Sequence, residues 1–238
     1  MPGELLCETC RSDLPLIDMR YACPRCGAPF GWLVCTECAP CSASGRLNAD
    51  DFAFSAARAC CSYEGVAKRL ITTYKDRGEA RLDATLAHLL CDCVRGTVLL
   101  SHPAPAGLIA ARKPVDASDW AAWADALVTI PANPDNLRRR GYDHMGRIAA
   151  LCAAKLSLPL QPALTTTRAA DQRALSGKQR AANRSGSFAL APDAAPLPPR
   201  ILLVDDVFTT GATLNAAART LLDGGAKEVR AATIARVW

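Results

Sequence analysis

One segment near the carboxyl end constrains the fold more than any other, because an apolar run leads directly into acidic and hydroxyl-rich residues. Residues 201–204 read Ile-Leu-Leu-Val, which is typical of a parallel strand buried on both faces. Asp205 and Asp206 follow, and residues 209–213 read Thr-Thr-Gly-Ala-Thr before a helical pattern at 213–222. In open α/β sheets, ligands sit outside the carboxyl ends of strands, so a ligand site is expected here.

The loop at 209–213 has the chemistry of a phosphate cradle. A helix start offers unpaired backbone N–H groups and the positive end of the helix dipole. Gly211 allows the backbone to approach an anion closely, and the threonines add hydroxyl donors. The two aspartates repel phosphate, so they suit sugar hydroxyls or help to hold Mg²⁺. Loop and acids together predict a ribose 5-phosphate site; the alternative is an ordinary strand–turn–helix with two solvated carboxylates.

Composition and charge narrow the class of protein. The chain has 238 residues, 50% of them apolar, which suits one α/β domain with a small appendage. The net charge of +5 is mild for a dedicated nucleic-acid binder. The start lacks a basic and apolar leader, and no charge-free apolar run reaches the roughly 18 residues of a membrane span. A cytoplasmic protein without membrane insertion is therefore expected.

Apolar periodicity predicts the order of elements in the larger part, residues 52–238. Helical spacing occurs at 63–74, 82–94 and 141–158, and strands are expected at 126–130, 201–204 and 229–237. This order favours a parallel sheet with flanking helices. The polar and basic stretch 165–187 has no apolar period and is expected to be a flexible hood loop that closes over a bound ligand.

Cysteines dominate the first part of the chain, residues 1–45. They form three C-x-x-C pairs, Cys7/Cys10, Cys23/Cys26 and Cys35/Cys38, with Cys41 in addition. Such pairs indicate a structural zinc site, because a segment this short cannot bury a core of its own. Two pairs suffice for one tetrahedral site, and the spacing alone leaves open which two share a metal. The alternative is a set of reduced, unligated thiols.

These motifs resemble those of the ComF family. Residues 201–214 are similar to the PRPP motif of type I phosphoribosyltransferases, and the segments 63–78, 130–143 and 172–188 look like further family motifs. The resemblance covers about residues 60–238 and, more loosely, the cysteine segment. Two places depart from the family pattern: Asp143-His144 stand where Asn-Gln is usual, and Ile130-Pro-Ala-Asn where Pro-Val-Pro-Leu is usual.

The resemblance implies an α/β fold of the type I phosphoribosyltransferase kind with an amino-terminal zinc ribbon. It implies that Asp205 and Asp206 are catalytic and bracket the ribose hydroxyls of PRPP, with Mg²⁺ as a cofactor. The residues that would bind the phosphates are Val204, Thr209, Thr210, Gly211, Ala212, Thr213, Ala132, Asn133, Lys75, Arg140 and Arg180.

The resemblance also implies an association with DNA uptake in competent bacteria, and with competence-machinery proteins as partners. Three roles stay open at this point. The chain is a phosphoribosyltransferase, a non-catalytic module that binds single-stranded DNA or a nucleotide, or a PRPP sensor. The acceptor cannot be read from the sequence, since acceptor pockets in this fold class are built from variable segments.

Overall fold

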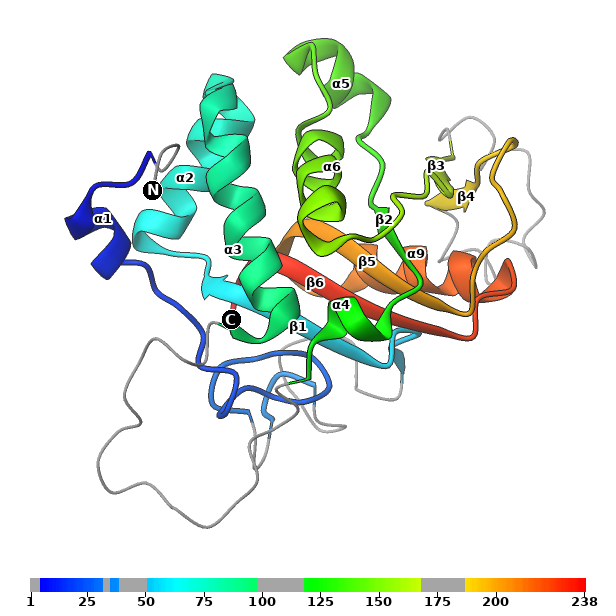
Figure 1. The fold of residues 1–238 in the computed structure, drawn as a ribbon, viewed down its shortest axis with the longest axis horizontal. Coiled ribbons are helices and arrows are strands. Elements are labelled where there is room, and N and C mark those ends of the chain that lie inside the picture. The colour runs from blue at the N-terminus through cyan, green and yellow to red at the C-terminus, as the bar shows by residue number, and fades with distance from the viewer. Residues whose placement is uncertain (1–4, 32–34, 39–50, 98–117, 168–186) are drawn as a thin grey trace.

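A parallel sheet forms the centre of the molecule. The computed structural model describes residues 5–31, 35–38, 51–97, 118–167 and 187–238 (Figure 1). In these residues four strands pair in the order β1-β6-β5-β2, all parallel. Their bounds are Ala56–Ser62 for β1, Ala126–Thr129 for β2, Arg200–Phe208 for β5 and Glu228–Arg236 for β6. The predicted parallel sheet is confirmed, whereas β1 was not anticipated.

The strand β5 lies inside the sheet and is buried on both faces, as the apolar run predicted. Val204 pairs with Ala232 of β6 on one side and with Thr129 of β2 on the other. Residues 201–204 are all 0% exposed, so each side chain lies in one of two apolar layers. Because β5 is held on both faces, the two aspartates that follow have a fixed position at the carboxyl end of the sheet.

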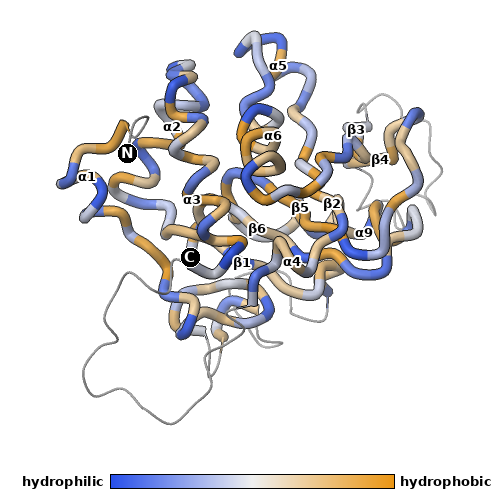
Figure 2. Tube along the Cα trace, viewed as in Figure 1, coloured by the Kyte–Doolittle hydropathy of each residue, from blue (hydrophilic) through white to orange (hydrophobic). Residues whose placement is uncertain are grey.

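Helices cover both faces of the sheet. The helices α2 (Gly65–Arg77), α3 (Asp83–Arg95) and α6 (His144–Leu156) share an apolar layer with Leu202 and Val204, and the short η2 (Ala80–Leu82) joins the first two. The helix α9 (Ala212–Asp223) packs with Ile201 and Leu203 on the opposite face. Figure 1 shows α3 and α6 on one side of the strands, and Figure 2 shows apolar residues along β5 and α6.

Short elements connect this framework. They are α4 (Trp120–Trp123), α5 (Pro134–Arg140), and an antiparallel pair formed by β3 (Leu164–Thr166) and β4 (Phe188–Leu190). The first two residues of the expected hood loop at 165–187 thus belong to β3, and β4 begins directly after the loop. Residues 168–186 between them lie outside the described residues.

Local sequence explains where the site-bearing helices begin and end. The Asp143 carboxylate caps α6 by accepting a 2.9 Å hydrogen bond from the amide of Gly146. Gly211 adopts the left-handed conformation with φ of 81° immediately before α9, which only glycine does at little cost. None of the described helices combines the length and the apolar content that crossing a membrane requires.

The cysteine-rich segment packs against the edge strand β1. It begins with a short helix, α1 (Glu8–Ser12), which no apolar period predicted. The amide of Ile17 donates to the Cys60 carbonyl at 2.8 Å, and the amide of Ala57 donates to the Arg25 carbonyl at 3.0 Å. The side chain of Arg25 donates to the Phe52 carbonyl at 2.9 Å and to the Phe54 carbonyl. The segment therefore covers a strand edge that would otherwise expose unpaired backbone groups.

Candidate functional site

A cavity of about 1050 Å³ lies at the carboxyl ends of the strands. Its lining includes Asp205 and Asp206 of β5, residues 130–133 after β2, and Tyr63 after β1. The volume is at the upper end of the range common for small-molecule sites, so it exceeds what one sugar phosphate needs. The position agrees with the expectation that ligands bind at this edge of an α/β sheet.

The threonine-rich loop borders this cavity. Thr209 and Thr213 line it, while the hydroxyl of Thr210 accepts a 3.3 Å hydrogen bond from the Ala212 amide. A Cβ on Gly211 would lie 2.8 Å from Cζ of Phe208 and 3.0 Å from Cε1 of Phe52. Both the positive φ and this close packing require glycine at the position. Of the five predicted loop residues, Thr209 and Thr213 line the cavity, and phosphate binding by the loop stays a prediction.

The two aspartates differ in their surroundings. Asp206 is buried, and its Oδ2 forms an ion pair with the Nζ of Lys75 and lies 3.0 Å from Nε2 of His144. Asp205 accepts a 2.9 Å hydrogen bond from the amide of Asp206. All four of these groups line the cavity, so the ion pair belongs to the site and does not seal the carboxylates away from it. It does mean that Asp206 already has a cationic partner before any ligand arrives.

The environments separate the pKa values of the pair. Burial, followed by the charge of Asp206, raises the pKa of Asp205 to about 8. Burial alone would raise the pKa of Asp206, but the hydrogen bond from His144 and the charge of Lys75 outweigh it and lower the value to about 2. At neutral pH the dyad therefore carries close to one negative charge, and Asp205 is an available hydrogen-bond donor.

His144 lines the cavity but was not among the site residues predicted from the sequence. Its side chain is 10% exposed, and its backbone carbonyl accepts a 2.9 Å hydrogen bond from the Tyr74 hydroxyl. The first residue of α6 is thereby fixed between α2 and the end of β5. The departure from the usual Asn-Gln at 143–144 was the only sequence signal that marked this place.

The other predicted phosphate-binding residues have three different outcomes. Lys75, Ala132, Asn133 and Arg140 line the cavity, although the Asn133 side chain already caps α5 by accepting from the Asp135 amide at 2.9 Å. Val204 must be corrected: its side chain is 0% exposed in the core, and its carbonyl accepts from the Ile130 amide at 3.1 Å, so it cannot contact a ligand. Arg180 lies outside the described residues.

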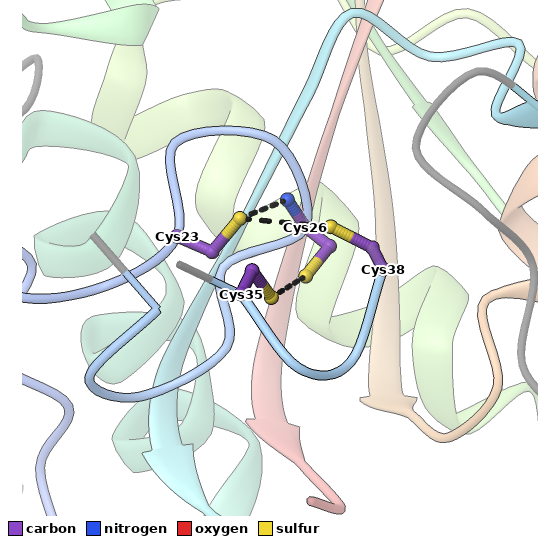
Figure 3. Close-up of side chains that lie close together, drawn as sticks. All are labelled: Cys23, Cys26, Cys35 and Cys38. Atoms are coloured by element: carbon purple, nitrogen blue, oxygen red, sulfur yellow. Dashed lines mark hydrogen bonds between the residues drawn. The ribbon is translucent and has the colours of Figure 1, made fainter. Parts of the chain in front are cut away.

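Four cysteines converge in a separate cluster on the α9 face of the sheet (Figure 3). The sulfur atoms of Cys23, Cys26, Cys35 and Cys38 all lie within 4.8 Å of one another. Cys23 and Cys38 are 3.7 Å apart, and Cys26 and Cys35 are 3.6 Å apart. Zn–S bonds of about 2.3 Å in a tetrahedron place sulfurs roughly 3.8 Å apart, so the cluster fits zinc.

Electrostatics in this cluster also favour a cation. Hydrogen bonds with Cys26 first and Cys38 next lower the pKa of Cys23, whereas hydrogen bonds with Cys23 first and Cys26 next raise the pKa of Cys38. Thiols this close together therefore cannot all ionise unless a bound metal ion neutralises the thiolate charges. Cys7 and Cys10 lie apart at α1, where the Cys7 sulfur accepts from the Cys10 amide at 3.4 Å. They are not in the four-cysteine cluster, and Cys41 lies outside the described residues.

The sequence of the chain is similar to those of known proteins. The family model described as a phosphoribosyl transferase domain matches residues 148–237, which contain β5, the threonine loop and α9. The chain is 31% identical over 112 residues to competence protein ComFC of Streptococcus pneumoniae, covering 46% of this chain and 47% of that protein. It is 29% identical over 173 residues to competence protein F of Haemophilus influenzae, covering 70% and 66%.

A third relative matches over a longer range. The chain is 26% identical over 224 residues to competence protein ComFC of Bacillus subtilis, which covers 94% of this chain and 80% of that protein. The chain spans about half the length of the pneumococcal relative and about two thirds of the Haemophilus one. The chain is therefore similar to competence proteins of the ComF kind, and its residues 148–237 match a phosphoribosyl transferase domain.

Proposed function

We propose that the chain binds PRPP with Mg²⁺ in the main cavity and transfers its phosphoribosyl group to an acceptor. The observation that carries the proposal is the position of Asp205 and Asp206 in one cavity with the threonine loop. The loop holds the 5-phosphate at the start of α9, and the dyad engages the ribose hydroxyls. Lys75 and the amides of Ala132 and Asn133 then serve as cationic and N–H partners of the diphosphate.

The proposed reaction forms a bond between a nucleophilic atom of the acceptor and C1 of the ribose. The C1–O bond to the diphosphate breaks, the diphosphate leaves with the electron pair, and the proton of the acceptor passes to solvent. Mg²⁺ would supply charge neutralisation on the diphosphate. The chain's own groups orient the sugar: protonated Asp205 donates a hydrogen bond, and ionised Asp206 accepts one.

Calorimetry on zinc-replete protein tests this function. PRPP with millimolar Mg²⁺ should bind, ribose 5-phosphate should bind more weakly, and ribose should not bind measurably. The D205N/D206N double variant should lose at least about ten-fold in affinity, the effect of two hydrogen bonds to hydroxyls. Asp223→Asn, which changes an exposed carboxylate at the far end of α9, is the matched control. Failure of the native protein to bind PRPP would remove the proposal.

A second candidate is a module that binds single-stranded DNA during transformation, as the names of the competence relatives suggest. Three arginines, at 138, 139 and 140, occupy the last turn of α5, and two of them line the main cavity. If this candidate is correct, oligodeoxynucleotide binding should fall with Arg138→Gln and survive D205N/D206N. An unchanged affinity in Arg138→Gln would count against it.

A further inference from the structure

A second cavity, of about 400 Å³, opens between the last turns of α2 and α5. Four cationic side chains line it, with one carboxylate and one phenol: Lys75, Arg77, Arg139, Arg140, Asp76 and Tyr142. The excess of positive charge suits a multiply charged anion. Lys75 and Arg140 line the main cavity as well, so these two side chains form a wall common to both cavities.

Arg140 has an unsatisfied donor in this wall. Its side chain is 11% exposed, and one terminal nitrogen donates to Oδ1 of Asp76 at 3.3 Å. Its Nε is buried and has no hydrogen-bond partner among the residues that the structure describes. A buried N–H without an acceptor is costly, so a small turn of this side chain towards an oxygen of a bound group would be favourable.

The usual pairing of basic side chains with helix-end carbonyls does not account for the four cationic side chains of the second cavity. Basic residues are common in the last turn of a helix, where they neutralise the exposed carbonyls. Here two such carbonyls already accept protein donors: that of Leu137 from the amide of Gly141 at 2.8 Å, and that of Tyr74 from the hydroxyl of Tyr142. Pairing with helix-end carbonyls therefore explains neither the cavity nor the buried Arg140 Nε, which has no acceptor among the described residues.

We propose that the second cavity binds the phosphate group of the acceptor, so that the acceptor is a phosphate monoester such as a mononucleotide. This inference rests on the proposed phosphoribosyl transfer. An acceptor must bring its nucleophile to the ribose above Asp206, and Lys75 both contacts Asp206 and lines the second cavity. A group held there is therefore one side chain away from the reacting sugar. The planar fork of arginine matches phosphate oxygens in pairs.

Calorimetry with two probes that differ only in a phosphate tests the site. Zinc-replete protein saturated with PRPP and Mg²⁺ is titrated with adenosine 5′-monophosphate and with adenosine. The monophosphate should bind at least about ten-fold more tightly. In the R77Q/R139Q variant the preference should shrink to within about two-fold, whereas Arg69→Gln, an exposed arginine on the same helix α2, should leave it intact.

The nitrogen spectrum of Arg140 locates the phosphate. Its Nε–H signal should shift and exchange more slowly with solvent when the monophosphate binds, and it should respond little to adenosine. No preference for the monophosphate, or a preference that R77Q/R139Q leaves unchanged, overturns the proposal. So does an oligothymidylate of about 12 nucleotides that binds through these arginines while the monophosphate does not.

The two proposals fail in different ways. If PRPP does not bind but the monophosphate preference persists and depends on Arg77 and Arg139, the transferase function falls and the phosphate site stands. If PRPP binds and the monophosphate preference is absent, the transferase function stands and the acceptor assignment falls.

Discussion

Arg236, the last residue of β6, donates a 2.7 Å hydrogen bond to the carbonyl oxygen of Cys26. A second terminal nitrogen lies 3.6 Å from the Cys26 sulfur, and the guanidinium carbon lies 4.0 Å from the ring centroid of Phe208. Phe208 ends β5, the strand that carries the aspartate dyad, and contacts Gly211. One buried side chain thus joins the cysteine cluster to the strand and loop of the main cavity.

Replacing Arg236 with methionine should therefore weaken both zinc binding and folding. Methionine retains an apolar stem but leaves the Cys26 carbonyl without its donor, so we expect a loss of about 2–3 kcal/mol in unfolding free energy. Denaturant unfolding and competition with a chromophoric chelator measure the two effects. Arg230→Met, a change on the same strand away from the cluster, should leave zinc affinity unaltered. Equal zinc affinities in the two variants would contradict the expectation.

Serine substitutions of the cysteines should separate two classes by metal content. Changing any of Cys23, Cys26, Cys35 or Cys38 removes one ligand of the compact cluster, so bound zinc should fall from about one per chain towards zero. Changing Cys7 or Cys10 should leave it near one, because these residues lie on α1 outside the cluster. Elemental analysis of purified protein gives the result. If zinc is also lost when Cys7 or Cys10 is changed, these two residues contribute to the metal site and the expectation is wrong.

Gly211→Ala should damage the phosphate loop and its packing. The added methyl group would lie 2.8 Å from Cζ of Phe208, and φ of 81° is unfavourable for alanine. We expect a loss of about 1–3 kcal/mol in stability and a weaker PRPP affinity. Gly225→Ala provides the control, because φ there is 110° but nothing lies within 4 Å. If both variants lose stability equally and keep their PRPP affinity, the close contact has no consequence.

Segments with strong local signals were predicted correctly. The apolar run of β5, the helix that follows the threonine loop and the order of the other predicted elements all follow from patterns within about a dozen residues. β1 was missed because Ala56–Ser62 contains no β-branched or aromatic residue that would mark a strand. It is stabilised instead by β6 on one side and by residues 15–25 on the other.

Long-range contacts could not be predicted in the same way. His144 and Asp206 are 62 positions apart, and no periodicity links them. The pairing of the cysteines was likewise open, because three equivalent pairs occur in the sequence. The fold decides it: Cys10 packs with the layer formed by α2 and α3, whereas Cys23, Cys26 and Cys38 pack with the layer of Phe52 and Phe54.

Asp205→Asn should change how stability depends on pH. A pKa raised from 3.8 to about 8 means that the folded protein holds this proton more tightly than the unfolded chain does. The stabilising contribution is complete below pH 3.8 and is lost as pH rises to about 8. The unfolding free energy of the variant, relative to that of the native protein, should therefore rise across this pH range by on the order of 1–3 kcal/mol.

Thermal or denaturant unfolding between pH 4 and 9, in a buffer without divalent ions, measures this difference. Asp206 does not confuse the result, because its pKa is lowered to about 2 and its contribution is lost only in acid. A constant difference between variant and native protein over the whole range would show that Asp205 is ionised in the folded state.

His144 should act on the ligand through Asp206. His144→Ala removes the group 3.0 Å from Asp206 Oδ2, so PRPP affinity should fall by about three- to ten-fold. His144→Gln offers an amide donor in its place and should recover part of the loss. A variant that merely disturbs packing would show no such rescue. The pH at which Asp206 titrates, followed by carboxyl NMR, should rise in His144→Ala and in that way report the lost hydrogen bond directly.

The contact between Lys75 and Asp206 would make binding of the proposed ligand an exchange of partners. The lysine pairs with the carboxylate, and in the proposed PRPP complex the diphosphate would take over that lysine. The number of attractive charge contacts then changes little, while the sugar hydroxyls replace an ion at Asp206. Because the number of ion pairs changes little on binding, affinity in this cavity should depend less on ionic strength than it would in an open cationic cleft.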